Sequence, residues 1–541
     1  MIERLAFLWP EIALFITTCV VMVVGLSRST GVRRLSALIT AVGLAAALVL
    51  AVATTPKAGQ FAPADGQTLF PDLPVFAKTL FAAVGLLLLP LLVGTVDRDD
   101  EREIAAGRRA FDPLRSNRAE FYAFYLFSLT GLMLCASASD LVWLFLALEL
   151  TSLPTYVMVA ISSRRHRAQE AAVKYFFLGA LGAACFLMGF AFIYGGTGTT
   201  RLNVIADVFA ASGINPIALA GLVLAVVGLA FKIAAVPMHF YTPDVYQGAS
   251  PSVAGMLAFV PKAAGFVSLI LVLGTVGWTH GPGGESGHSL PESLRVILWV
   301  MAALTMTVGN VLALLQSSVR RVLAYSSVAH SGYMLVALVA GPGDGSAASN
   351  GLAAVLFYLL AYGVMNLGAF AVLASLVRRN PKDGSADEID SFDDLRGLCA
   401  TRPFHGWTLV VCALSLLGFP PLLGFFAKVP LFTSGIAAGE YTLVVILGLN
   451  SAIAAFYYLR LVQMPLLEKP DPTTPVPEPV GVPSRTAAGL LSAAGAVVLI
   501  AVAGSLFDQA HRASRDPRTV APARDAAGEP PAAPPIAARP E

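Results

Sequence analysis

The sequence predicts an all-α, polytopic membrane protein with about 14 transmembrane helices, some of them broken. Of its 541 residues, 56% are hydrophobic and only 13% are charged, about half the charged share of an average soluble protein. The apolar residues fall into separate runs of roughly 20, the length that a helix needs to cross the hydrocarbon core. These runs make membrane lipid the expected environment. The net charge of +2 gives no electrostatic reason to expect a nucleic acid as partner.

The apolar runs place the transmembrane spans in order along the chain. They lie at 5–26, 35–54, 76–96, 121–138, 140–161, 171–195, 215–236, 249–275, 293–316, 322–340, 351–377, 405–434, 440–464 and 484–507. Pro and Gly within the eighth and twelfth spans predict broken helices, because Pro removes a helical hydrogen bond and Gly weakens the helix.

Basic residues in the loops predict the orientation of these spans. Alternate loops, beginning with 27–34 and 97–120, hold 21 Lys and Arg, against 3 in the loops of the other side before the C-terminal tail. Because cytoplasmic loops are enriched in Lys and Arg, the basic side is expected to be cytoplasmic and both termini to lie outside. The Pro/Ala/Arg-rich tail, 508–541, is expected to be disordered, although its five arginines run against this orientation.

Four charged side chains are expected at membrane depth. Glu149 lies in the fifth span, Lys232 near the cytoplasmic end of the seventh, Lys262 near the centre of the eighth and Lys428 beyond the break in the twelfth. Such groups are costly, about 2.5–3.5 kcal/mol on insertion scales, and usually mark ion pathways. The alternatives are a lysine that extends its ammonium to the interface and a purely structural ion pair with Glu149.

A buried lysine with an acidic neighbour can act as a switchable proton site. Burial disfavours the charged form and a nearby carboxylate favours it. A thousandfold change in proton affinity is about 4 kcal/mol, which matches the cost of moving one proton against roughly 180 mV. A chain of such sites could therefore pump protons.

Three further residues are weaker candidates for a proton relay. His330 lies mid-span in AYSSVAHSGYM, where a core histidine with satisfied hydrogen bonds is the alternative. His239 lies at the cytoplasmic mouth beside Lys232 and could instead tether its loop. Lys174 begins the sixth span, where extension to the interface is the simpler interpretation. None of these residues has the spacing of a metal site, and the five cysteines are scattered.

Several stretches resemble the antiporter-like membrane subunits of respiratory complex I, the proton-translocating NADH-quinone oxidoreductase. PMHFYTPDVYQGASPSVAGMLAFVPKAAGF at 237–266 is closest to the N type, since the other types have a PLHTWLPDAH-like loop there. Further matches are LELTSLPTYVM around Glu149, EAAVKYFFLGA around Lys174, AYSSVAHSGY around His330 and GFPPLLGFFAK around Lys428. The lysine in the last of these stretches also separates the chain from the M type, which has Glu there.

The resemblance implies roles for the four membrane-depth charges. Glu149 and Lys232 would form the ion pair of the input half. Lys262 would be the central proton site, and Lys428 the site on the output side. The implied fold has two inverted five-helix repeats, at 120–275 and 293–464, after an N-terminal three-helix region, 1–119, and before the last helix, 484–507.

The resemblance also implies the setting of the chain. NADH, FMN, iron–sulfur clusters and quinone would belong to other subunits, so this chain would hold no cofactor and carry out no redox chemistry itself. Its partners would be the other membrane-arm subunits, including antiporter-like neighbours, in a bacterial inner membrane.

Two other functions stay open from the sequence. An Mrp-like cation/proton antiporter would use the same lysines with a different coupling ion, and co-purification with a quinone-reducing complex would separate the two. A scaffold subunit with vestigial charges is the third possibility. The presence of all four membrane-depth charges in one chain argues against it.

Overall fold

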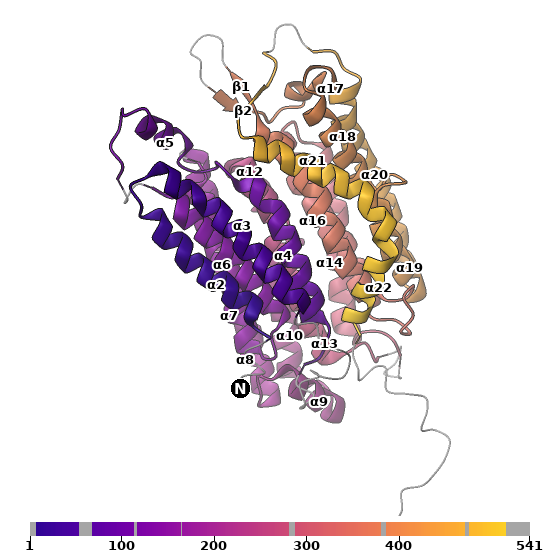
Figure 1. Ribbon diagram of the computed structural model, residues 1–541. Helices are drawn as coiled ribbons and strands as arrows, with labels where there is room; N and C mark the ends of the chain where they lie inside the picture. Colours follow the sequence, from indigo (N-terminus) through magenta and orange to yellow (C-terminus); the bar gives the residue numbers. More distant parts are fainter. Residues whose placement is uncertain are drawn as a thin grey trace, which may run out of the picture.

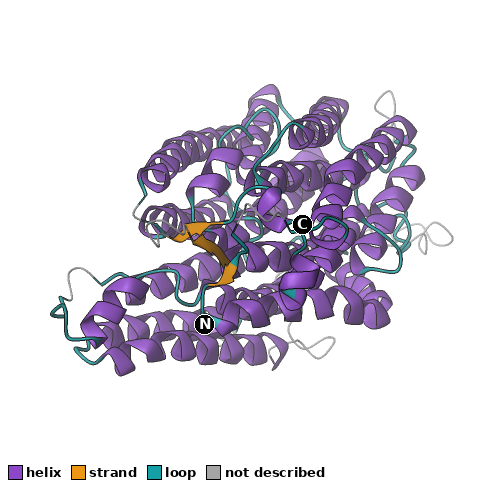
Figure 2. Ribbon diagram, turned by 90° about the horizontal axis from the view of Figure 1, so that it is seen from above, coloured by secondary structure: helices purple, strands orange, loops and turns teal. Residues whose placement is uncertain are grey.

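The computed structural model describes residues 7–53, 68–112, 116–163, 165–280, 287–379, 386–470 and 475–515, which form a bundle of long helices (Figures 1 and 2). In this described part, 11 helices are long and apolar enough to cross a membrane. The other three predicted spans are formed by shorter apolar helices: the first, the seventh and the two halves of the twelfth. The predicted fold class, an all-α polytopic membrane protein, is therefore confirmed.

The helices follow the predicted order. The N-terminal region contains α2 (Trp9–Gly25), α3 (Thr30–Ala53), α4 (Leu73–Leu92) and the charged α5 (Arg98–Ala105). Spans four to eight are α6 (Arg118–Ala136), α7 (Leu141–Ile161), α8 (His166–Thr197), α10 (Pro216–Lys232) and the pair α12 (Pro251–Leu257) and α13 (Val260–Val276). Two short helices, α9 (Leu202–Ser212) and α11 (Thr242–Gly248), connect them.

The second group of spans has a similar arrangement. It contains α14 (Glu292–Leu314), α15 (Val319–Ala340), α16 (Gly351–Ser375), α18 (Pro403–Leu417), α19 (Leu423–Ala437) and α20 (Tyr441–Leu466), with α17 (Leu398–Thr401) before α18. The last span is α21 (Pro483–Val498) followed by α22 (Ala503–Ala513). The apolar stretches of α13 and α15 are completely buried inside the protein, and that of α16 almost completely. These three helices therefore form the centre of the bundle.

Both predicted helix breaks are present. The eighth span is interrupted between α12 and α13, and the twelfth between α18 and α19. A third break follows Lys232, the last residue of α10. The Tyr241 hydroxyl donates to the Phe231 carbonyl (2.8 Å), and the Val236 N–H donates to the Thr305 hydroxyl (2.9 Å). These side chains satisfy backbone groups that an unbroken helix would pair internally.

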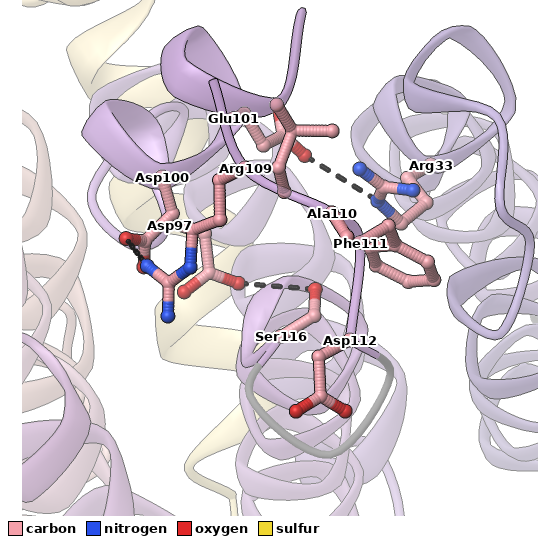
Figure 3. A pocket seen from close by; sticks show the side chains of 10 residues that line it. Arg33, Asp97, Asp100, Glu101, Arg109, Ala110, Phe111, Asp112 and Ser116 are labelled. Carbon is pink, nitrogen blue, oxygen red and sulfur yellow. Dashed lines mark hydrogen bonds and ion pairs between the residues drawn. The ribbon is translucent and has the colours of Figure 1, made fainter. Parts of the chain in front are cut away.

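The loops predicted to share the basic side meet at one end of the bundle. Glu101 of α5 pairs with Arg33 of α3 (3.7 Å) and with Arg118 of α6 (2.7 Å), beside a cavity of about 20 Å³ (Figure 3). Arg165, before α8, pairs with Glu388 at 3.3 Å. Figure 1 shows α5, α17 and two strands at this end and α9 at the other. Contacts between loops distant in sequence therefore agree with the predicted alternation of the spans.

A small antiparallel sheet at the basic end was not predicted. Its strands are β1 (Leu376–Arg379), β2 (Ala386–Glu388) and β3 (Glu478–Pro479), in the order β2–β1–β3 (orange in Figure 2). The strands are two to four residues long and mostly polar, so no alternation of apolar and polar residues could reveal them. The sheet links the end of α16 to the loop before α21.

The predicted end of the last span was wrong. Residues 508–513 belong to α22 instead of the expected disordered tail. His511 is buried and contacts the Asn350 side chain at 3.2 Å, and the Ser514 hydroxyl accepts from the same side chain at 3.0 Å. The Pro-rich composition of the tail does not begin at 508. The stretch FDQAHRAS before it contains two small alanines, Ala510 and Ala513, that are buried against the bundle. Residues 516–541 lie outside the described part of the chain.

The orientation is testable by labelling single cysteines in intact cells. We expect cysteines in the 97–120 and 378–404 loops to be protected from an impermeant thiol reagent, and those in 276–292 to react. Reaction of the 378–404 loop from outside would reverse the orientation and the order of the lysines across the membrane.

Candidate functional site

Glu149 and Lys232 form an ion pair between α7 and α10. The Lys232 Nζ lies 3.3 Å from a Glu149 carboxylate oxygen and donates to the Ser152 hydroxyl at 2.5 Å. The Lys232 side chain is 2% exposed and that of Glu149 is 18% exposed. Gly265 of α13 packs closely against Lys232. A Cβ at position 265 would lie 3.0 Å from the Lys232 Cβ, so the glycine leaves room for the lysine.

Lys262 joins the first group of helices to the second. It is the third residue of α13, directly after the break, and is only 2% exposed. Its Nζ donates to the backbone carbonyl of Ser327 in α15 and lies 5.7 Å from the centre of the Tyr362 ring in α16. The ammonium therefore contacts a neutral acceptor and an aromatic face, both from the second group of helices.

A small cavity lies between Lys232 and Lys262. Its volume is about 10 Å³, close to the space that one water molecule needs. Both lysines line it, together with Tyr241, Thr242, Val245 and other residues of α11 and its neighbours. The Thr242 hydroxyl is buried and has no hydrogen-bond partner within the described residues. A water in this cavity would therefore have polar partners on the path between the lysines.

His330 lies in a cluster of tyrosines at the centre of the bundle. Its Nδ1 is 2.6 Å from the Tyr358 hydroxyl, and its Nε2 is 2.8 Å from the Tyr458 hydroxyl. Because a neutral imidazole has one donor and one acceptor, one tyrosine donates to the ring and the other accepts from it. The Tyr458 hydroxyl also contacts the Ser326 hydroxyl. Such a chain can transfer a proton by exchanging donors and acceptors.

Lys428 lies next to the break in the twelfth span. Its Nζ donates to the Leu417 carbonyl (2.7 Å) at the end of α18 and lies 5.2 Å from the centre of the Tyr333 ring. The Tyr333 and His330 rings are 5.4 Å apart. Gly418 has a φ of +86°, and a Cβ there would lie 2.9 Å from the Lys428 Cδ. The structure therefore places Lys428 beside the histidine–tyrosine cluster.

Glu149, Lys232, Lys262, His330 and Lys428 follow one another through the bundle and are called the row below. Two of the candidate relay residues lie apart from it. The Lys174 side chain is 42% exposed and pairs with Glu170 (2.8 Å) and Asp244 (2.9 Å) at the basic end. His239 lies in the loop between α10 and α11 and is not among the residues that line the cavity. Its Nδ1 is buried without a hydrogen-bond partner in the described part of the chain.

Sequence reasoning missed several residues that contact the row. Ser152 is on the same helix face as Glu149, one turn later, so a spacing of three residues could have identified it. Tyr358 and Tyr458 come from α16 and α20. Their distance from His330 in the sequence left no local signal. Tyr325, which lies closer in sequence, is not a hydrogen-bond partner of the ring in the described structure.

Fold and site together define an ion-translocating, polytopic membrane protein with a row of buried lysines. Among the described residues, no group of three or more His, Cys, Asp or Glu could hold a metal ion. Residues 138–454 match the model of the NADH:quinone oxidoreductase/Mrp antiporter transmembrane family. The chain belongs to this family, which confirms the resemblance seen in the sequence.

Similar proteins support this assignment over most of the chain. NADH-quinone oxidoreductase subunit N of Salinibacter ruber is 41% identical over 395 residues, 72% of this chain and 74% of that protein. F(420)H(2) dehydrogenase subunit N of Methanosarcina mazei is 34% identical over 506 residues, covering 92% and 96%.

Solved structures share the fold. A chain of respiratory complex I from Thermus thermophilus is 32% identical, with a TM-score of 0.72, over 92% of this chain and 98% of that one. A chain of the Mrp complex from Dietzia sp. is 19% identical, with a TM-score of 0.73, over 95% and 97%. At that identity, the second likeness shows the fold alone.

Gly418 offers a test of the position of Lys428. We expect Gly418→Ala to push the lysine away from the Leu417 carbonyl and to lower proton uptake by membranes that contain the assembled protein. Gly439→Ala is the matched control, because Gly439 also has a positive φ (+75°) but no atom within 4 Å of a Cβ. Both variants bear the same backbone strain, about 1–2 kcal/mol. Equal proton uptake by the two would show that the position of Lys428 does not matter.

Proposed function

We propose that this chain is a proton-translocating membrane-arm subunit of an NADH-quinone oxidoreductase and that its buried titratable row carries the protons. The observation that carries the proposal is the row itself, which runs from one group of helices into the other. Its members are Glu149, Lys232, Lys262, His330 and Lys428. Buried charges of this kind at membrane depth mark ion pathways.

The input half would work through the charge of Lys232. With Glu149 near, the ammonium is stabilised, and when the carboxylate moves away, the buried charge becomes unfavourable. Lys262 is the other basic residue that lines the cavity. Two ammonium groups in such a low-dielectric space repel each other. A proton therefore favours one lysine or the other, and a change at Glu149 decides which of them holds it.

The output half would pass the proton through the tyrosine cluster. The Ser327 carbonyl that accepts from Lys262 belongs to α15, one helical turn before His330. His330 then reaches Tyr358 and Tyr458, and its ring contacts Tyr333, which lies beside Lys428. This order gives Lys428 the role of the last titratable site.

Helix contacts support the division of the chain into two five-helix repeats, 120–275 and 293–464. Neighbours in the first repeat have counterparts in the second: α6–α7 with α14–α15, α8–α10 with α16–α18, α6–α13 with α14–α20, and α7–α13 with α15–α20. Lys232 and Lys428 then occupy the broken fourth spans of their repeats. The region 1–119 and the last span, predicted at 484–507, lie outside the repeats.

The electron donor and its cofactors would be properties of the partner subunits. The chain resembles subunits of complexes named for NADH, for NAD(P)H and for F(420)H(2), so this subunit does not determine the donor. NADH, FMN, iron–sulfur clusters and quinone would therefore bind in other subunits. The partners would include antiporter-like neighbours of the membrane arm.

We place the protein in a bacterial inner membrane with the basic end in the cytoplasm and both termini outside. In this orientation protons would move from the cytoplasm outward, with the Glu149–Lys232 pair as the input site and Lys428 as the output site. The alternative, an Mrp-like antiporter, has the same fold, but the identity to the complex I chain is 32% against 19% to the Mrp chain. Co-purification with a quinone-reducing complex would support the first function.

Replacing the central lysine tests the proposal. Lys262→Met keeps the apolar stem and removes the titratable group, so the complex should assemble in near-normal amount while proton translocation fails. Lys262→Arg should also impair it, because a guanidinium does not release its proton. The measurement is quinone reductase activity and proton uptake in membranes normalised for complex content.

A second buried lysine provides the control for that experiment. Lys78 of α4 is also 2% exposed and pairs with Glu11 at 2.8 Å, but it lies outside the row. The double variant Lys78→Met/Glu11→Gln removes this pair without leaving an unpaired charge. It should keep proton uptake per electron. Normal pumping by Lys262→Met would make that lysine a structural residue.

A further inference from the structure

The short helix α11 covers the cavity between the two lysines. Thr242 and Val245, on its inner side, are buried and line the cavity, as does Tyr246. The Tyr246 hydroxyl also contacts the Ser327 hydroxyl at 3.3 Å, next to the carbonyl that accepts from Lys262. The position of α11 therefore determines whether the cavity is separated from the basic end.

Asp244, on the side of α11 that faces away from the cavity, forms ion pairs with a residue of each group of helices. One carboxylate oxygen accepts from the Lys174 Nζ of α8 (2.9 Å) and the other from the Arg321 guanidinium of α15 (2.8 Å). The Asp244 side chain is half-buried. Partial burial acts to raise its pKa, but hydrogen bonds and charges from Lys174 and Arg321 hold the pKa below its usual range. The carboxylate is therefore ionised at neutral pH and joins two cations from different repeats.

We infer that Asp244 is a positioning residue for proton transfer, because its two ion pairs hold α11 against α8 and α15 and so keep the cavity between Lys232 and Lys262 closed to water from the basic end. The second part of this inference, the effect on transfer, rests on the proposed function. The first part, closure of the cavity, rests on geometry alone.

Closure matters because the cavity lies between two sites that must exchange a proton with each other. Free access of bulk water would give either lysine a second partner and let protons return to the side from which they came. Water would also weaken the repulsion between the two ammonium groups by raising the local dielectric constant. Loss of Asp244 should therefore uncouple proton transfer from electron transfer.

Other contacts keep the basic end assembled without Asp244. Arg320 pairs with Asp390 (3.1 Å) and Glu388 (3.0 Å), and Lys174 keeps its pair with Glu170. Removing the Asp244 carboxylate should therefore loosen α11 and leave the surrounding helices in place.

Thiol labelling measures the closure directly. The probe is Thr242→Cys, because Thr242 lines the cavity and is only 1% exposed. The solubilised, assembled complex is treated with an impermeant maleimide. The peptide that contains residue 242 is then analysed. We expect Asp244→Asn to speed labelling on the order of tenfold, as two half-exposed ion pairs can account for. Asp244→Glu should label slowly, like the native sequence.

Glu170→Gln is the matched control, because it removes the other partner of Lys174 and leaves Asp244 in place. It should label slowly. Arg321→Gln removes one of the two pairs of Asp244 and should give an intermediate rate, which keeps the test available if Asp244→Asn lowers the amount of complex. Equal rates for Asp244→Asn and the native sequence, or fast labelling of Glu170→Gln, would overturn the closure.

Proton uptake per electron tests the second part. Asp244→Asn should reduce it while quinone reductase activity continues, and Glu170→Gln should not. Full coupling in an Asp244→Asn complex that labels rapidly would overturn the positioning role. Failure of the proposed function itself would appear separately, as normal pumping by Lys262→Met whatever the labelling result.

Discussion

The need of a buried ammonium for a polar partner explains most of this structure. Within a bilayer, side-chain partners are scarce, and an unbroken helix uses its own carbonyls. Each of the three lysines of the row lies at a helix break. Lys232 is the last residue of α10, Lys262 the third of α13, and Lys428 bonds the carbonyl at the end of α18. The breaks release backbone groups where charge must be accommodated.

The direction of the helices at each break makes the three lysines unequal. The C-terminal end of a helix carries partial negative charge and favours a cation, whereas the N-terminal end opposes it. Lys232 is the last residue of α10, and Lys428, a residue of α19, places its Nζ at the C-terminal end of α18. Lys262 lies at the N-terminal end of α13. In the proposed pathway, this difference suits the first and last sites to holding a proton and the central one to passing it on.

Part of this arrangement could be predicted from the sequence, and the reason differs between residues. The order of the spans and the breaks follow from hydrophobic length, Pro and Gly, and the Glu149–Lys232 pair followed from the family resemblance. Tyr358 and Tyr458, the hydrogen-bond partners of His330, could not be predicted, because they approach it from distant helices through packing alone. The end of the last span was misplaced because composition describes a whole segment and does not show at which residue its packing against the bundle ends.

The first and second groups of helices are joined at the break after Lys232, and this limits how the backbone there can move. The Ser331 hydroxyl of α15 donates to the Ile233 carbonyl at 2.6 Å. The Thr305 hydroxyl of α14 accepts from the Val236 N–H. Backbone groups freed in the first group of helices are thus satisfied by hydroxyls of the second. A backbone movement at the break after Lys232 must either break these bonds, at a cost of about 1–3 kcal/mol for each group left unpaired, or displace α14 and α15 with it. Because α15 also carries Ser327 and His330, in the proposed pathway the second course would transmit a change at the Glu149–Lys232 pair to Lys262 and the tyrosine cluster without a further moving part.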